Sequence, residues 1–465
     1  MTPFEPTVES LQHYRCPKWF RDAKFGIYVH WGAYSVAEHG EWYARQLYIQ
    51  GHPDYEHHVK TYGHPSEFGY KDFIPMWKAE NFDPDALLGL FKRAGARYFA
   101  PCAIHHDNFD LWDSTHHEWN SVNMGPQKDI TGLWREATLQ HGLRFGVTTH
   151  LARSYSWFNT NKTSDSEGPK EGVPYDGANP ELADFYFDQH DDTDRRQPVD
   201  PPEWWRKQWA RRITDLIDNY HPDHLYFDGS LPFNNDGGRA GMEVVAHYYN
   251  HNMAQHDGRL EGVMCMKRTS GGHGRYEQGV ATLDLERRRA DYILPDYWQT
   301  DTSIGPWGYD VRRPYRPAGE IICELVDIVS KNGNMLLNVP PKADGTLDDE
   351  TVGILETIGG WLDVNGDAIY GTRPWLTSGS GPARFTTKGN ALYAICIELP
   401  QDGIVRIPEL SAGPGIPELA RQARVRAVRL LGHEGELSCA QTRDELQVTL
   451  PDQLPCEHAV ALVLK

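Results

Sequence analysis

Short apolar runs alternate with helical segments over the first three quarters of the chain, and turn residues separate them. Strands are predicted at residues 25–29, 97–104 and 143–150, and each run leads into histidine-bearing polar sequence. Helices are predicted at residues 83–94 and 129–141; the first begins with an Asp-Pro pair, and each is followed by glycine. Repeated strand–helix–strand units of this kind favour an α/β fold with a parallel sheet.

The same alternation resumes after a long polar segment at residues 159–202, which is rich in Asp, Gly, Pro and Ser. We interpret that segment as a long loop or an excursion from the sheet. The elements predicted after it are a helix at 203–220, strands at 225–227, 260–266 and 334–339, and helices at 320–330 and 348–365.

The pattern changes near residue 375 to short runs with alternating apolar and polar residues. Such runs are typical of antiparallel strands, and their number predicts a small β-sandwich. A segment rich in Gly, Ser and Pro at residues 372–382 separates the two patterns. The predicted domains are therefore residues 1–375 and residues 376–465. The alternating runs are residues 391–397, 425–431, 446–450 and 459–464.

One predicted strand ends in a carboxylate and is the first candidate for chemistry. The apolar run at residues 225–227 stops at Asp228, and Gly229 allows the chain to turn there. In an α/β barrel, catalytic groups lie at the C-terminal ends of the strands. Asp228 is therefore a candidate nucleophile, with a turn residue or a helix cap as the alternative interpretation.

The composition of the 465-residue chain is that of an ordinary globular protein, with 39% hydrophobic and 24% charged residues. The net charge of −19 argues against binding to nucleic acid or to an anionic membrane, and it predicts a substrate that is not strongly anionic. The first residues lack the features of a signal peptide, so a cytoplasmic location is expected unless a leader was removed. No apolar stretch approaches the roughly 20 residues of a membrane span.

Seven cysteines are scattered along the sequence without a CxxC pair. This pattern predicts reduced thiols rather than a disulfide framework or a zinc finger. No cofactor is expected, and assembly into a homo-oligomer is left open.

Polar residues gather at the predicted strand ends, and their joint placement points to chemistry, although each alone is compatible with a structural role. Three interpretations compete: a divalent-metal hydrolase, a glycoside hydrolase with two carboxylates, and a binding module without catalysis. The absence of HExxH, and of an HxH pair on the first strand, disfavours the metal hydrolase. The residues concerned are His30, His105, His106, His150, Asp228 and Arg268, with Glu41 and Trp42 on an early loop.

Several motifs, in order along residues 19–375, resemble the α-L-fucosidase family of glycoside hydrolases (family 29). Taken together, these motifs are specific to that family, and the β-rich tail resembles the family's C-terminal domain in its placement. The motifs are residues 24–35, 41–43, 103–112, 119–120, 142–146, 226–229, 330–338, 343–346 and 364–375.

The resemblance implies a (β/α)8-like barrel followed by a C-terminal antiparallel β-sandwich. It also implies retaining hydrolysis of terminal α-L-fucosides in oligosaccharides or glycoconjugates, without a metal ion. Asp228 matches the family's nucleophile in a Phe-Asp-Gly motif. The residues that match sugar-binding positions or are expected near them are His30, Glu41, Trp42, His105, His106, Tyr155, Trp157, Arg268 and Trp307.

The acid/base residue departs from the usual family pattern. Many members have Glu in a Trp-Glu pair where this chain has Gln299, and glutamine cannot donate a proton as an acid. A family subset with Gln here has an upstream Asp-x-Glu-Arg, which residues 284–287 match, so Glu286 is the predicted acid/base. Glu277 and Asp301 are the alternatives. The replacement also leaves open a catalytically weak fucose-binding barrel. A related α-L-galactosidase is a further alternative, because its substrate differs from a fucoside only by a hydroxyl at C6 and the sequence does not show which group faces that position.

Overall fold

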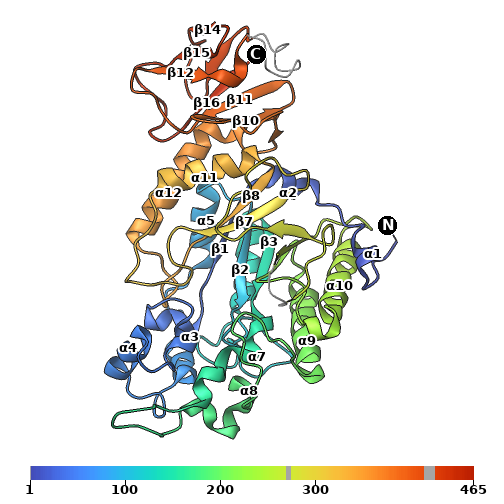
Figure 1. Cartoon of the computed structure of the whole chain (residues 1–465), viewed down its shortest axis with the longest axis vertical. Coiled ribbons are helices and arrows are strands. Elements are labelled where there is room, and N and C mark those ends of the chain that lie inside the picture. Colours follow the sequence, from blue (N-terminus) through green and yellow to red (C-terminus); the bar gives the residue numbers. More distant parts are fainter. Residues whose placement is uncertain (1, 269–273, 413–424) are drawn as a thin grey trace.

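The structure is a computed structural model that describes residues 2–268, 274–412 and 425–465. Eight parallel strands close into a barrel in strand order, and the last strand pairs with the first (Figure 1). This confirms the predicted α/β class and the barrel that the resemblance implies. The strands are β1 (Phe25–Val29), β2 (Tyr98–Ile104), β3 (Arg144–Thr149), β4 (His224–Phe227), β5 (Val263–Lys267), β6 (Thr282–Asp284), β7 (Trp298–Ser303) and β8 (Gly333–Asn338).

Helices make most of the crossovers between neighbouring barrel strands (Figure 1). In the described residues between β5 and β7, at 274–281 and 285–297, loops take the place of helices. None of the helices in the described residues has both the length and the apolar composition needed to cross a bilayer. The helices are α1 (Val8–Leu11), α2 (Lys18–Ala23), α3 (Tyr43–Gln46), α4 (Pro53–Thr61), α5 (Pro84–Arg93), α6 (Ile130–Gln140), α7 (Ser154–Trp157), α8 (Ala183–Tyr186), α9 (Glu203–Tyr220), α10 (Arg239–Gln255), α11 (Ala318–Ser330) and α12 (Asp349–Asn365).

Side chains at the predicted helix starts cap α5 and α6. Asp83 accepts a hydrogen bond from the backbone N–H of Ala86 (3.0 Å), and Asp129 accepts one from that of Gly132 (2.9 Å). The first N–H groups of a helix have no partner within it, so a polar residue that binds them determines where the helix begins. The predicted bounds of both helices agree with the structure to within one residue.

The barrel strands are buried on both faces, as near-continuous apolar runs predict. Every residue of β1, β2, β4 and β8 is buried. β7 is equally buried, although its sequence is Trp-Gln-Thr-Asp-Thr-Ser. The apolar-run criterion does not detect β6 or β7, because some of their buried residues are polar and find partners inside the barrel.

Two antiparallel sheets follow the barrel and lie beyond α11 and α12 (Figure 1). Trp361 of α12 donates a hydrogen bond to the carbonyl of Ala459 (2.7 Å), and Arg384 pairs with Asp327 of α11 (2.6 Å). Apolar residues of both sheets share one core, as in a sandwich. The domain division after residue 375 stays a prediction. The strands are β9 (Arg373–Pro374), β10 (Ala383–Lys388), β11 (Ala391–Cys396), β13 (Val428–Leu430) and β16 (Val460–Leu464) in one sheet, and β12 (Ile404–Ile407), β14 (Cys439–Gln441) and β15 (Leu446–Thr449) in the other.

Candidate active site

The C-terminal ends of the barrel strands surround a pocket of polar and aromatic side chains. His30 directly follows β1, His105 follows β2, His150 follows β3 and Asp228 follows β4, while Lys267 is the last residue of β5. Parallel strands bring these ends to one rim, where barrel enzymes have their sites. The residues that line the pocket are His30, Glu41, Trp42, His105, His106, His150, Arg153, Asp228, Lys267, Glu286, Asp301 and Trp307.

Asp228 has several positively charged or imidazole neighbours. Its Oδ1 atom lies 2.5 Å from Nζ of Lys267, and its Oδ2 atom lies 3.2 Å from Nδ1 of His150 and 3.7 Å from a guanidinium nitrogen of Arg153. Burial acts to raise the pKa of Asp228, but Lys267, His150 and Arg153 outweigh it and hold the pKa well below its usual range. The carboxyl is therefore ionised at neutral pH, as a nucleophile requires.

The backbone around Asp228 is held by the sheet on one side and by a turn on the other. The N–H of Asp228 donates to the carbonyl of Thr149 (3.1 Å), which continues the ladder between β3 and β4. Gly229 has a φ of 145°, which residues with side chains rarely adopt. A Cβ atom at this position would lie 2.1 Å from Nε2 of Gln197. The predicted turn at Gly229 is confirmed.

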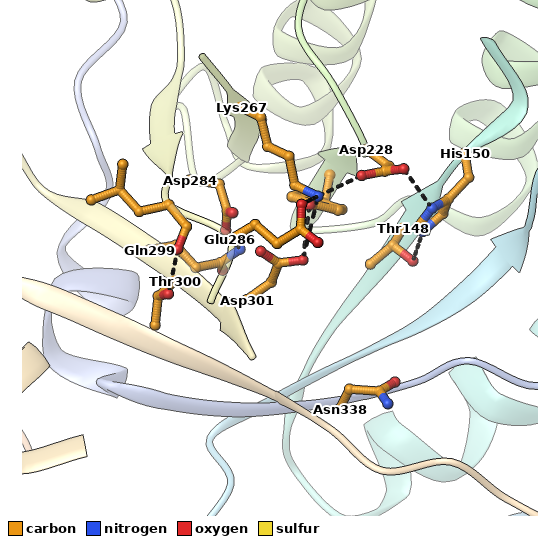
Figure 2. Close-up of polar contacts among 12 residues, drawn as sticks. Thr148, His150, Asp228, Lys267, Asp284, Glu286, Gln299, Thr300, Asp301 and Asn338 are labelled. Carbon is orange, nitrogen blue, oxygen red and sulfur yellow. Dashed lines mark hydrogen bonds and ion pairs between the residues drawn. The ribbon is translucent and has the colours of Figure 1, made fainter. Parts of the chain in front are cut away.

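Lys267 joins Asp228 to a second carboxylate, that of Glu286 (Figure 2). The Nζ atom lies 2.8 Å from Oε2 of Glu286 and 2.5 Å from Oδ1 of Asp228. The two carboxylate oxygens are therefore separated by at most the sum of these distances. That limit is close to the roughly 5–5.5 Å separation of the carboxyl groups in retaining glycosidases.

The charge of the bridging ammonium is secured by its surroundings. Burial acts to lower the pKa of Lys267, but Asp228, Asp301 and the other nearby carboxylates raise it well above its usual value. Lys267 therefore stays protonated over the whole range in which the protein is expected to work.

Among the three carboxyls considered as acid/base, Glu286 has the position that suits the role. It lies in the loop two residues beyond β6, and its side chain is 44% exposed at the pocket. Glu277 pairs with Arg275 (2.6 Å) and is not part of the lining. Asp301 lies on β7, is 3% exposed and accepts a hydrogen bond from the hydroxyl of Tyr226 (3.0 Å). Glu286 stays the predicted acid/base.

Four histidines form one wall of the pocket, and neighbouring rings have centroids 4.2 to 5.5 Å apart. Burial, helped by the nearby His150, lowers the pKa of His30 to about 3. Burial also holds the pKa values of His105 and His106 well below the usual value. These three rings are therefore neutral at physiological pH. A neutral imidazole has one donor and one acceptor, which suits the hydroxyl groups of a sugar.

Asn338, at the end of β8, orients His30. Its Oδ1 atom accepts hydrogen bonds from the backbone N–H (3.0 Å) and from Nδ1 (2.9 Å) of His30, and its Nδ2 group donates to the carbonyl of Trp307 (2.7 Å). The proton of His30 is thus assigned to Nδ1, and Nε2 is left as an acceptor. Asn338 belongs to a motif that carried the resemblance, but its contact with His30 needs the closure of the barrel.

The aromatic residues expected near the sugar occupy different positions. Trp42 and Trp307 line the pocket. Trp157 is fully buried, and its ring lies 4.8 Å from that of Trp42, so it supports the wall from behind. Tyr155 stacks on His190 (4.0 Å) and does not line the pocket.

Arg268 was expected near the sugar ring, and this expectation needs correction. Its side chain is exposed and stacks on Tyr276 at 5.3 Å, outside the pocket lining, whereas Lys267 reaches into the pocket. Successive residues of an extended chain point to opposite sides, so only one of two neighbouring basic residues faces the barrel mouth. Sequence reasoning also omitted Arg153. A basic residue at the end of the buried run Val-Met-Cys-Met was the available indication for Lys267.

A second group of acidic side chains lies inside the barrel next to Lys267 (Figure 2). Asp301 accepts hydrogen bonds from Tyr226 (3.0 Å) and Tyr28 (3.2 Å). Asp284 accepts one from Nε2 of Gln299 (2.8 Å), and Figure 2 shows both of these side chains. Burial and the neighbouring charge of Asp301 raise the pKa of Asp284 well above its usual range. Asp284 therefore keeps its proton at neutral pH. Gln299 is fully buried, so it holds Asp284 rather than facing a substrate.

Two sets of three side chains in the pocket are close enough to hold a metal ion. The ligand atoms of each set lie within 4.8 Å of one another. The cations Lys267 and Arg153 next to Asp228 oppose a divalent ion at the second set, because like charges repel strongly in a partly buried site. The charges favour catalysis by carboxylates over a metal centre. The sets are His30, His105 and His150, and His106, His150 and Asp228.

Comparisons with known proteins find matches for both parts of the chain. Residues 1–367 match the family model for alpha-L-fucosidase, and residues 379–465 match that for the alpha-L-fucosidase C-terminal domain. The chain is 31% identical to the tissue alpha-L-fucosidase of Rattus norvegicus, over 97% of this chain and 89% of that protein. It is also similar to crystal structures of Thermotoga maritima alpha-fucosidase. In complex with a mechanism-based inhibitor, that structure has a TM-score of 0.78 and 30% identity over 99% of both chains. In complex with fucose, the TM-score is 0.76, with 30% identity over 99% of this chain and 100% of that chain.

Proposed function

The chain belongs to the α-L-fucosidase family of glycoside hydrolases, and from this premise we propose that it hydrolyses terminal α-L-fucosides with retention, through a covalent glycosyl-aspartate. The observation that carries the retaining mechanism is the pair of carboxylates, Asp228 and Glu286, on the single ammonium of Lys267. The upper limit on the distance between these oxygens disfavours the wider spacing of inverting enzymes, in which a water molecule lies between the two carboxyl groups.

In the first step, Oδ of Asp228 attacks the anomeric carbon while the bond to the leaving oxygen breaks. Glu286, acting as the general acid, gives a proton to that oxygen, so the aglycone leaves as a neutral alcohol and the sugar is held as an ester. In the second step, Glu286 takes a proton from water, the hydroxide oxygen attacks the anomeric carbon, and Asp228 leaves as a carboxylate. Two inversions at one carbon give net retention.

The remaining pocket residues have roles that follow from their charge state. The neutral rings of His30, His105 and His106 offer hydrogen bonds to sugar hydroxyls without adding positive charge. Trp42 and Trp307 offer apolar faces for the ring carbons and the C6 methyl group of fucose. Lys267 keeps Asp228 ionised before attack and stabilises it again when it leaves.

The proposal is tested with 4-nitrophenyl α-L-fucoside. We expect release of nitrophenol, and we expect NMR to show α-fucose as the first sugar product, before it equilibrates with the β anomer. First formation of β-fucose would contradict the retaining mechanism. Absence of turnover together with tight binding of fucose would instead favour a binding barrel. The same assay on the corresponding α-L-galactoside, which adds a hydroxyl at C6, tests the related activity.

A further inference from the structure

A second, larger cleft opens beside the active-site pocket. It has a volume of about 710 Å³ and shares Glu41, Trp42 and Trp307 with the lining of that pocket. Arg287 lines the cleft and directly follows Glu286, the residue that would protonate the leaving oxygen. Under the proposed function, the sugar attached to fucose leaves on the side of the acid/base. The cleft is therefore placed to hold that leaving sugar.

Four arginines line this cleft, and two of them form ion pairs with carboxylates of the protein. Arg312 donates to both oxygens of Asp310 (2.8 and 2.9 Å) and to Asp54 (2.6 Å). Arg316 donates to Glu324 (2.7 Å). Each pair joins the cleft wall to a neighbouring element, so these two guanidinium groups are occupied.

The other two arginines, Arg287 and Arg313, keep donors available. The guanidinium of Arg287 stacks on Trp307 (4.2 Å) and donates one hydrogen bond, to the carbonyl of Gly305 (3.1 Å). That of Arg313 lies 3.5 Å from Asp310, which Arg312 already binds at shorter distances, and its side chain is 70% exposed. Within the described residues, neither has a short hydrogen bond to a carboxylate.

Charge in this cleft is layered, with carboxylates behind and guanidinium groups in front. The side chains of Asp54 and Asp310 are 1% and 3% exposed, whereas those of Arg312 and Arg313 are 38% and 70% exposed. Burial raises the pKa of Glu41 at the junction with the pocket, although both Arg287 and Arg313 act to lower that pKa. A ligand in the cleft therefore faces positive charge. The whole-chain charge of −19 predicts the opposite preference, because it averages over the entire surface.

We propose that this cleft binds an acidic leaving sugar, one that carries a carboxylate or a sulfate group, through Arg287 and Arg313. A guanidinium group matches the geometry of either anion with paired N–H donors. This inference rests on the proposed function and adds to it the class of glycan, an acidic one, from which fucose is removed.

The test compares kcat/KM for three fucosyl disaccharides that differ only in the second sugar: a neutral hexose, its sulfate ester and the corresponding uronic acid. We expect the wild-type protein to prefer one or both acidic substrates by about ten-fold, and we expect 0.5 M salt to reduce that preference. In R287Q and R313Q, the ratio of acidic to neutral kcat/KM should fall about five-fold or more. R288Q changes the next, exposed arginine outside the cleft and should keep the wild-type ratio.

The two acidic substrates separate a sulfate site from a carboxylate site, and a preference for either supports the proposal. A wild-type ratio near one, or ratios that stay unchanged in both R287Q and R313Q, would overturn it. If the protein hydrolyses 4-nitrophenyl α-L-fucoside but shows no preference for the acidic disaccharides, the proposed function stands and only this inference fails. Failure to cleave any fucoside would overturn both.

Discussion

Asp228 at the barrel mouth and Asp284 inside the barrel show how different surroundings shift the pKa of the same kind of side chain in opposite directions. At the mouth, the side chain of Asp228 is 11% exposed, and its pKa is held well below the usual range, because Lys267, His150 and Arg153 outweigh burial. Inside the barrel, Asp284 is 2% exposed, and its pKa is raised well above the usual range, because its acidic neighbour Asp301 adds to burial. Under the proposed function, the ionised Asp228 attacks the anomeric carbon, whereas Asp284 keeps its proton and has a structural role through its hydrogen bond with Gln299.

The difference teaches that burial alone does not decide whether a carboxyl is reactive. The partner groups decide it, and Lys267 contacts the mouth carboxylate at 2.5 Å but lies 3.7 Å from Asp301. Substitutions that remove a partner or a charge should therefore affect Asp228 and Asp284 differently: activity should change in one case and stability in the other.

Asp228→Asn should have the largest effect. The amide keeps the shape of the side chain but cannot form the glycosyl ester, so turnover of an aryl α-L-fucoside should fall on the order of 10⁴-fold or more. Calorimetry with fucose should still show binding. If the variant turned over substrate at near the wild-type rate, Asp228 would not be the nucleophile, and its lowered pKa would have no catalytic consequence.

Glu286→Ala should come next, with a loss of about 10²- to 10⁴-fold for substrates with poor leaving groups. Added azide should restore turnover of an aryl fucoside with a good leaving group, because the small anion replaces the water that Glu286 would activate. Glu277→Ala, which changes a carboxylate outside the pocket lining, is the matched control. Azide rescue of the control rather than of Glu286→Ala would transfer the acid/base role.

Lys267→Gln should bring Asp228 closer to the behaviour of Asp284. In the wild-type protein, the pKa of Asp228 is held well below its usual range. Asp228 therefore stays ionised in mild acid and does not limit activity there. Without the ammonium, burial acts with less opposition, and the acid limb of kcat/KM should move up by about one to three pH units. Arg268→Gln, at the neighbouring exposed residue, should leave the profile in place. An unmoved limb in Lys267→Gln would mean that another group holds the charge of Asp228.

Asp284→Asn should have the smallest effect, on stability. Because the pKa of Asp284 is raised by folding, the native state binds a proton that the unfolded chain loses above about pH 3.9. The free energy of unfolding should therefore fall by up to about 1.4 kcal/mol per pH unit above that point, until Asp284 ionises in the folded protein. Asparagine keeps a donor for Asp301 and should remove this contribution.

Urea unfolding of both proteins from pH 4.5 to pH 8 measures this difference. The gap between the two curves should widen with pH in favour of Asp284→Asn. If the free energies of unfolding of the two proteins changed in parallel with pH, Asp284 would be ionised in the native state. Asp228 and Asp284 would then differ in their positions but not in their charge.

Local sequence was sufficient for much of the barrel, because strands buried on both faces must be apolar wherever they touch the core. The runs that became β1 to β5 and β8 are of this kind, and a carboxylate that ends such a run, Asp228, was identifiable as a candidate for that reason. β6 and β7 escaped, since Asp284, Gln299 and Asp301 are polar and become acceptable inside a barrel only when each finds a partner on another strand.

Tertiary structure alone decided which neighbours share the site. Whether Lys267 or Arg268 enters the pocket depends on the direction in which the last residue of β5 points. Glu286 was already the predicted acid/base, but its contact with Lys267 exists only in the folded barrel. The arginine-lined cleft joins loops near residues 40 and 310 that are far apart in the chain. The sequence by itself determined the family and six of the eight barrel strands, and it identified Asp228 as the candidate nucleophile, because these inferences depend on local burial and local motifs. The charge states of the site residues and the contacts between them depend on distances of a few ångströms between residues that are far apart in the sequence. Only the closed barrel determines these distances.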